Sequence, residues 1–291
     1  MIDAMIQLIH VSKTYDRRPA LSDLTLDIEK GEFVLLMGPS GSGKSTLLRM
    51  LIAAEIPDEG QIFVQGKNVT KLKKSEIPFL RRKVGTVFQD FRLLPKKSVF
   101  DNVALPLIVQ GASSVDIRRK VTEALRAVGV DHKKDQLPTS LSAGEQQRVC
   151  IARAIVNGPI VLLADEPTGN LDTRTSIEIM GIFQRLNREH GLTVLVITHE
   201  PDIAHYATRI ITCRDGLIRS DHPVENRRDA DHEDRDQHQV GAEIEQGAQS
   251  LEIGDDLGQA RHDVVEPLGR HANETGQPLV RRRLDRLREG M

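Results

Sequence analysis

Short runs of apolar and β-branched residues recur along the first 216 positions, and stretches with helical spacing lie between them. Apolar runs of about four to eight residues, bounded by Gly, Pro or charged residues, indicate buried strands. Strands are predicted at 6–11, 20–28, 32–38, 61–66, 83–89, 160–166, 192–199 and 209–216. Because such strands are apolar on both faces and alternate with helices, they predict an α/β fold with a buried parallel sheet.

The pattern changes between Phe91 and Gly158, where strand signals are absent. Apolar residues recur there at helical spacing over 114–130 and 142–158. We therefore predict a helical subdomain at about 91–158, inserted into a domain that covers residues 1–221.

A second change follows Ser220, because no Lys and no aromatic residue occurs from there to Met291. Residues 222–291 carry 10 basic and 16 acidic side chains, whereas residues 1–221 carry 30 and 26. A stretch this polar buries too little apolar surface to offset its chain entropy. We therefore predict that residues 222–291 are disordered, with at most a short helix near 278–290. Its role stays open between a solvated tail, a tether for a partner and the product of an altered reading frame.

The overall composition agrees with a protein of a reducing compartment. Hydrophobic residues make up 39% of the 291 positions, which is enough for a sizeable core. Cys150 and Cys213 are far apart in the chain, and we expect both to be buried thiols. No stretch approaches the roughly 18 uncharged apolar residues of a membrane helix, so a cytosolic location is expected and any membrane role requires a partner.

A glycine-rich motif lies between the strand at 32–38 and a helical pattern at 46–54. It reads Gly38, Pro39, Ser40, Gly41, Ser42, Gly43, Lys44, Ser45 and Thr46. Glycines let consecutive backbone N–H groups curl around an anion, and the helix start adds the positive end of its dipole. The motif predicts a triphosphate site, with Lys44 on the β- and γ-phosphates and the Ser45 hydroxyl on Mg²⁺. The alternative is a strand-to-helix turn with a chance lysine.

Two acidic residues, Asp165 and Glu166, end the apolar run 160–164. The carboxyl ends of parallel strands are where α/β sheets bind ligands. Asp165 therefore suits the Mg²⁺ side, and Glu166 suits the polarisation of a water that attacks the γ-phosphorus. The alternative is a pair of acids that cap the next helix.

The strand at 192–197 ends in Thr198 and His199, which places an imidazole at the same sheet edge. His199 could hydrogen-bond a γ-phosphate oxygen or the attacking water. A histidine at a strand end is more often structural, so this role depends on the other motifs.

The stretch Leu141–Gln146 precedes a helix predicted at 147–156, with Ser142 at the N-cap and Glu145 at capping-box spacing. A well-capped helix explains these two residues. The small pair Ala143 and Gly144 would also keep a helix N-terminus clear for an anion, and both interpretations remain open.

Taken together, the motifs resemble the ordered motif series of ABC ATPases. The matching parts are residues 38–46, Gln89, 141–146, 162–172 and 197–200, and the resemblance covers residues 5–220. Ala143 stands where the family usually has Gly, and Glu145 stands where many members have Gln.

The resemblance implies a P-loop NTPase (RecA-like) core with an antiparallel β edge and an inserted all-helical subdomain. It also implies a head-to-tail homodimer with two ATPs, each held by the phosphate loop of one subunit and by Ser142, Ala143 and Gly144 of the other. On this template Tyr15 stacks on adenine and Asp172 contacts the opposite subunit. Gln89 contacts Mg²⁺ and links it to the helical subdomain.

The segment 87–121 is similar to the cell-division group of these ATPases. That similarity implies an FtsX-like four-span membrane protein as partner, the divisome tubulin homologue as a further partner, and a location at the cytoplasmic face of the inner membrane. ATPases of lipoprotein release and macrolide export share 162–172 and the signature, so this alternative stays open. No nucleic-acid partner is expected, because the chain has neither a coiled-coil insertion nor a second cassette.

Overall fold

The computed structural model describes residues 4–231. Its elements are β1 (Ala4–Tyr15), β2 (Arg18–Glu29), β3 (Phe33–Met37), α1 (Lys44–Leu51), β4 (Glu59–Val64), β5 (Lys67–Asn68), α2 (Ile77–Lys83), β6 (Val84–Val87), α3 (Val99–Val109), α4 (Ser114–Ala127), α5 (Ala143–Ile155), β7 (Val161–Asp165), α6 (Thr173–His190), β8 (Thr193–Thr198), the 3₁₀ helix η4 (Pro201–Tyr206), β9 (Arg209–Arg214) and β10 (Leu217–Pro223). The tail predicted beyond residue 231 lies outside the described residues.

The main sheet has six strands in the order β10-β9-β3-β8-β7-β6. All its neighbouring strands pair in parallel except β9 and β10, which pair antiparallel. The predicted buried parallel sheet is therefore confirmed. The antiparallel β10 was not predicted, because its exposed polar residues lack the apolar run that marks a buried strand.

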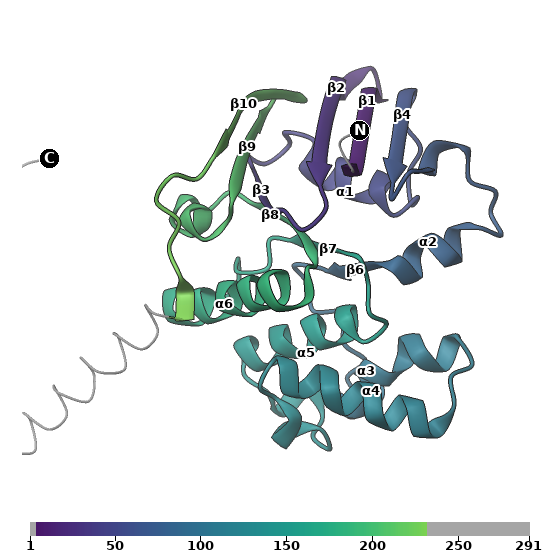
Figure 1. Cartoon of the computed structure of the whole chain (residues 1–291), viewed down its shortest axis with the longest axis vertical. Helices are drawn as coiled ribbons and strands as arrows, with labels where there is room; N and C mark the ends of the chain where they lie inside the picture. The colour runs from purple at the N-terminus through teal and green to yellow at the C-terminus, as the bar shows by residue number, and fades with distance from the viewer. Residues whose placement is uncertain (1–3, 232–291) are drawn as a thin grey trace, which may run out of the picture. The chain divides into compact units, whose positions relative to one another are not determined.

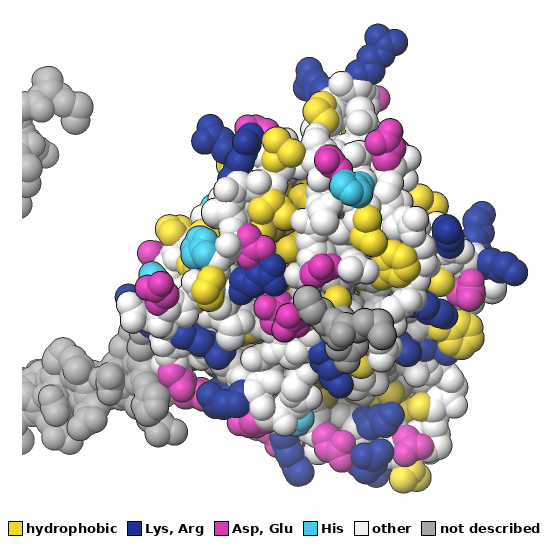
Figure 2. Space-filling model, turned by 45° about the horizontal axis from the view of Figure 1, so that its top comes forward, with side chains coloured by type: hydrophobic (Ala, Val, Ile, Leu, Met, Phe, Trp, Pro, Cys, Tyr) yellow, Lys and Arg dark blue, Asp and Glu magenta, His cyan; other side chains and the backbone are white. Residues whose placement is uncertain are grey.

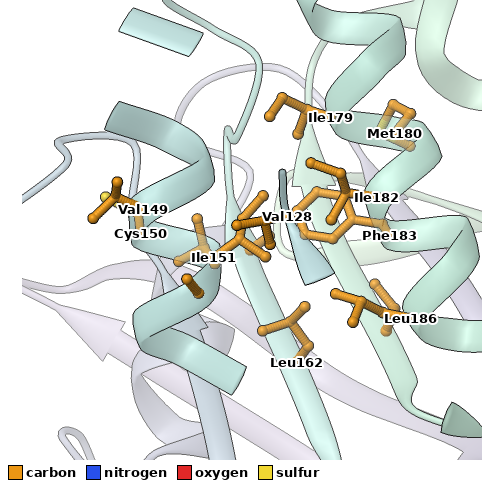
Figure 3. Close-up of a cluster of buried hydrophobic side chains, with 14 of the residues drawn as sticks. Val128, Val149, Cys150, Ile151, Leu162, Ile179, Met180, Ile182, Phe183 and Leu186 are labelled. Atoms are coloured by element: carbon orange, nitrogen blue, oxygen red, sulfur yellow. The ribbon is translucent and has the colours of Figure 1, made fainter. Parts of the chain in front are cut away.

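Each face of this sheet packs against a different layer. Alternate residues such as Leu162 and Val194 pack against α5 and α6, whereas Leu163 and Leu195 pack against α1 and the strands β1, β2 and β4. Figure 3 shows Ile151 of α5 and Phe183 of α6 converging over Leu162. The sheet is thus covered on both sides, which explains its near-continuous apolar strands.

A second, antiparallel sheet has the order β2-β1-β4-β5. Its strands β1 and β2 are twelve residues each and alternate between buried and exposed positions over much of their length. Figure 1 shows this sheet at the opposite end of the molecule's described part from α3, α4 and α5. The expected antiparallel β edge is present.

Helices α3, α4 and α5 occupy the chain between β6 and β7, and no strand lies among these residues, all of which the structure describes. Helix α5 begins at Ala143, four residues before the predicted start at Gln147. The prediction was late because it counted the polar residues after the N-cap as a loop, although they form the first helical turn.

The domain boundary predicted at residue 221 falls inside β10, which ends at Pro223. Residues 224–231 continue from β10 onto α6 and η4. The backbone N–H of Arg228 donates to the His205 carbonyl at 2.8 Å, and Ala230 is 1% exposed. The buried Gln184 amide binds the Arg228 carbonyl and the Ala230 N–H. One buried alanine and a few backbone bonds leave no signal in a composition averaged over seventy residues.

Acidic and basic side chains are interspersed on the face shown in Figure 2, with small apolar groups between them. Neither sign forms a continuous field on that face. Among the described residues, no helix has the length and apolar character needed to cross a membrane. Cys150 and Cys213 are both buried free thiols, as predicted, and burial raises the pKa of Cys150 to about 12.

Candidate functional site

The predicted phosphate loop connects β3 to α1 and closes around a lysine. The Lys44 ammonium donates to the carbonyl oxygens of Gly38 at 2.6 Å and Pro39 at 3.0 Å. A Cβ on Gly38 would lie 2.1 Å from the Cys213 carbonyl oxygen, and one on Gly43 would lie 2.2 Å from the Ala20 carbonyl oxygen. Only glycine therefore fits these two positions, and the loop is packed tightly against β2 and β9.

The remaining loop residues differ in exposure. Ser45 is exposed, while Ser42 and Thr46 are buried. The Ser42 hydroxyl has no hydrogen-bond partner among residues 4–231, and the Ser42 backbone carbonyl accepts a hydrogen bond from the Cys213 thiol at 3.1 Å. Cys213, on β9, is a support of the loop that the sequence pattern did not identify.

Asp165 ends β7 next to this loop. The Ser45 hydroxyl donates to Asp165 Oδ1 at 3.4 Å. Burial raises the pKa of Asp165 and outweighs the Ser45 hydrogen bond. A half-buried carboxylate with a neighbouring hydroxyl is the kind of oxygen donor set that Mg²⁺ takes, because the cation offsets the cost of partly burying the negative charge.

Glu166 and His199 meet at the ends of neighbouring strands. The Glu166 carboxylate Oε2 lies 3.0 Å from His199 Nδ1 and 3.4 Å from the His199 backbone nitrogen. The Glu166 backbone has a φ of 47°, in the left-handed region that non-glycine residues seldom adopt, and its N–H donates to the Ile197 carbonyl at 2.8 Å. This backbone is held in an unusual conformation, as at many functional sites.

Gln89 follows β6 and faces the loop after Glu166. The Gln89 side-chain nitrogen lies 3.6 Å from where a Cβ on Gly169 would stand. The Asn170 side-chain amide donates to the backbone carbonyl of Gln89 at 3.5 Å. Gln89 also lines a groove of about 390 Å³ between this loop and the helical segment. Gln89 thus lies between the groove and the loop that follows Glu166 at the end of β7.

Tyr15 lies at the end of β1 and is 37% exposed. Its hydroxyl donates to Glu55 Oε2 at 2.6 Å, and the Lys13 ammonium lies 5.5 Å from the ring centre. Burial raises the pKa of Tyr15, and Thr46 of α1 is among the neighbours that affect it, so the ring stands close to the phosphate loop. A partly exposed ring at this place could stack on a base.

Ser142 caps α5 through a complete capping box. Its backbone N–H donates to Glu145 Oε2 at 2.9 Å, and its hydroxyl accepts from the Glu145 backbone N–H at 3.2 Å. The hydrogen bond from the Ser142 backbone N–H lowers the pKa of Glu145, and the Lys133 ammonium pairs with the Glu145 carboxylate at 3.1 Å. The charge of Glu145 is therefore turned toward the cap and Lys133.

Asp172 caps α6 beside the start of α5. It accepts from the Thr175 backbone N–H at 2.9 Å and from the Thr175 hydroxyl at 2.6 Å, and these bonds lower its pKa. A Cβ on Gly144 would stand 2.5 Å from the Thr175 methyl group. Packing against α6 is thus one reason for glycine at position 144.

The sequence-predicted residues therefore form two groups. The phosphate loop, Tyr15, Gln89, Asp165, Glu166 and His199 surround the ends of β3, β7 and β8, whereas Ser142, Ala143, Gly144 and Asp172 lie at the starts of α5 and α6. Figure 1 shows α5 well apart from α1, with the main sheet between them. The sequence patterns assigned no role to four supporting residues, Glu55, Cys213, Thr168 and Glu200, although Thr168 and Glu200 lie within the matching stretches 162–172 and 197–200.

The comparisons with known proteins agree with this geometry. The family model described as ABC transporter matches residues 21–169. The cell division ATP-binding protein FtsE of Mycobacterium tuberculosis (strain ATCC 25618 / H37Rv) is 55% identical over 201 residues, which are 68% of this chain and 87% of that protein. The macrolide export ATP-binding/permease protein MacB of Chlorobium luteolum (strain DSM 273 / BCRC 81028 / 2530) is 48% identical over 222 residues, 75% of this chain and 33% of that protein.

A solved structure extends the match to three dimensions. It is a dimeric ATP-binding cassette in a post-hydrolysis state with bound ADP and Pi, 38% identical, with a TM-score of 0.70. The match covers 76% of this chain and 99% of that one. The family match over half the chain, the FtsE-type relatives and this cassette lead to one conclusion: the chain belongs to the ABC transporter family and is an ATP-binding ATPase.

Proposed function

We propose that this ATPase works as one half of an ATP-dependent homodimer that drives an FtsX-like four-span membrane protein in cell division. The observation that carries the proposal is the similarity to FtsE, which extends over most of that relative's length. Purification from membranes of the source organism, followed by identification of the co-purifying membrane protein, tests it. A four-span protein and a division defect on depletion are expected.

ATP binds, in this proposal, with its triphosphate in the loop Gly38–Thr46 and its adenine on Tyr15. Lys44 would turn its ammonium from the Gly38 and Pro39 carbonyls to the β- and γ-phosphates. Ser45, Gln89 and Asp165 would hold Mg²⁺, which would neutralise developing charge on the phosphates. The closeness of Ser45 to the half-buried Asp165 carboxylate, whose pKa is raised, supports this assignment.

For hydrolysis, Glu166 polarises the attacking water and His199 contacts the γ-phosphate. Their 3.0 Å contact supports a joint role, because a carboxylate can orient an imidazole through one ring nitrogen and leave the other free for a phosphate oxygen. His199 Nε2 is then the atom that faces the nucleotide.

The second ATP contact comes from another copy of the chain. Ser142, Ala143 and Gly144 lie at a helix N-terminus away from the phosphate loop of their own chain, and Asp172 is beside them. A helix N-terminus favours an anion such as the γ-phosphate of the partner's ATP. Two chains in head-to-tail arrangement would bring each group to the other.

The membrane partner docks, we propose, in the groove that Gln89 lines. The groove also presents Arg92, Pro138, Thr139 and Gln146, so it borders both the nucleotide site and the helical segment. Thr139→Arg should lower partner co-purification at least about tenfold by filling the groove. Thr139→Ser is the matched control, and equal capture of both variants would reject this docking site.

The MacB similarity favours a second candidate, the ATPase of a lipoprotein-release or macrolide-type exporter. Co-purification with an exporter permease, together with lipoprotein mislocalisation or drug sensitivity on depletion, would support it over the first. Under either proposal the chain is held at the cytoplasmic face of the inner membrane by its partner. The divisome tubulin homologue is proposed as a further partner only under the first.

A further inference from the structure

Two loops carry the residues proposed for hydrolysis, and they are joined by two contacts. The first is the Glu166–His199 pair. The second is a hydrogen bond from the Thr168 hydroxyl to Glu200 Oε2 at 2.9 Å. Thr168 lies two residues after Glu166, and Glu200 directly follows His199, so the second contact runs beside the first.

The second contact is held firmly at both ends. Thr168 is 1% exposed, and its carbonyl accepts from the Leu171 backbone N–H at 2.9 Å. The Glu200 backbone N–H donates to the hydroxyl of Thr198 at 3.0 Å, and Thr198 is fully buried at the end of β8. The bond therefore ties the loop after β7 to the end of β8.

His199, in contrast, is held weakly by its own packing. Its side chain is 58% exposed, and its hydrogen-bond partner within the described residues is Glu166. Glu166 itself has the left-handed φ of 47°, a conformation that persists only where the surroundings impose it. The Glu166 side chain is 14% exposed, so it is the more exposed imidazole whose position depends on the loop that carries it.

We propose that Thr168 and Glu200 are positioning residues, which keep the His199 imidazole against the Glu166 carboxylate by fixing the two loops together. The inference rests on the proposed function of Glu166 and His199. Without the Thr168 hydroxyl, the Glu200 carboxylate loses its donor and turns toward solvent, and the chain at His199 is released. A displacement of the imidazole then lowers the rate of hydrolysis without removing any group from the nucleotide.

Thr168→Val removes the hydroxyl at nearly constant volume, and Thr168→Ser keeps it. We expect Thr168→Val to lower kcat for ATP hydrolysis roughly tenfold with KM for ATP within about twofold, because misplacement of a reacting group affects the chemical step. Thr168→Ser should remain within about twofold of the unchanged protein. Glu200→Leu should behave like Thr168→Val, and Glu200→Gln, which keeps an acceptor, like Thr168→Ser. If Thr168→Val fails to fold, the comparison of Glu200→Leu with Glu200→Gln tests the positioning role instead.

A double-variant cycle separates positioning from a general effect on structure. In a His199→Ala background, Thr168→Val should cause little further loss of kcat, because the residue acts through the histidine. The full tenfold loss in that background, or unchanged kcat in both Thr168→Val and Glu200→Leu, would overturn the inference.

A spectroscopic readout keeps this inference distinct from the proposed function. The imidazole proton resonance of His199, assigned by its loss in His199→Ala, should shift in Thr168→Val and not in Thr168→Ser. An unshifted resonance would overturn the positioning role. Full turnover in His199→Ala would instead reject the role proposed for His199.

Discussion

At the scale of single residues, the site depends on contacts between strand ends that are far apart in the chain. Motif spacing was enough to predict that Asp165, Glu166 and His199 share a sheet edge, because parallel strands bring their carboxyl ends together. It could not predict that the Tyr15 hydroxyl binds Glu55 or that Cys213 lies under the phosphate loop. Such partners are set by packing in three dimensions, and no local periodicity encodes them.

Glu166→Gln should lower kcat by about a hundredfold or more while ATP still binds, because it removes a contact made in the transition state. Lys44→Ala should lose ATP binding itself. Turnover and equilibrium binding of a fluorescent ATP analogue measure the two effects. Full turnover by the glutamine variant would exclude Glu166 as the residue that activates water.

Asp165→Asn should stabilise the nucleotide-free protein at neutral pH while abolishing Mg²⁺-dependent hydrolysis. Burial raises the pKa of Asp165 in the folded chain. The folded state therefore binds the proton more tightly than the unfolded state, and stability falls as pH rises from the unfolded pKa through the folded pKa. The destabilisation is complete above the folded pKa and absent below the unfolded one.

Denaturant unfolding of both proteins at several pH values measures this difference. The gain from Asp165→Asn should shrink toward acid pH, where the aspartate is protonated in both states. A gain that grows on acidification would contradict the account.

At the scale of elements, the parallel strands of the main sheet and the N-cap Ser142 of α5 were readily predicted, because each carries its own local signal. The edge strand β10 and the segment 224–231 were not, since their stability comes from α6 and η4. Asp231 forms ion pairs with Arg185 and Arg188, and a Cβ on Gly181 would lie 3.3 Å from the Ala230 Cβ. These partners lie more than forty residues earlier, which is why composition alone assigned the segment to a disordered tail.

Two truncations of the chain test this segment. Ending the chain after Asp231 should leave the thermal midpoint within about 1 °C. Ending it after Pro223 should lower the midpoint by about 5 °C, since the buried Gln184 amide loses two partners at a cost of about 2 kcal/mol. Differential scanning calorimetry gives both values, and equal midpoints would show that residues 224–231 add nothing to stability.

The start of α5 distinguishes a structural cap from an anion contact. Aspartate caps helices about as well as serine, so Ser142→Asp should change stability by less than about 0.5 kcal/mol. Its negative charge should nevertheless oppose a partner's γ-phosphate and lower kcat about tenfold or more. Unchanged kcat in this variant would leave Ser142 with its capping role alone.

At the scale of the whole molecule, the proposed function assigns two halves of an ATP site to each chain, and these halves do not meet within it. The phosphate loop and the acidic strand ends form one half, and the starts of α5 and α6 form the other. Motif order could predict both halves through family resemblance. In the proposed function a second chain brings the two halves together, and this step has to be tested on the assembled protein.

The mass of the Glu166→Gln variant with saturating Mg²⁺ and ATP tests this central claim most directly. The 32.4 kDa chain should sediment as a dimer with ATP and as a monomer without it. The double variant Glu166→Gln, Ser142→Asp should bind ATP yet remain monomeric, because the cap is kept and the anion contact is lost. A Glu166→Gln chain that binds ATP and stays monomeric, or a double variant that dimerises equally well, would contradict the account.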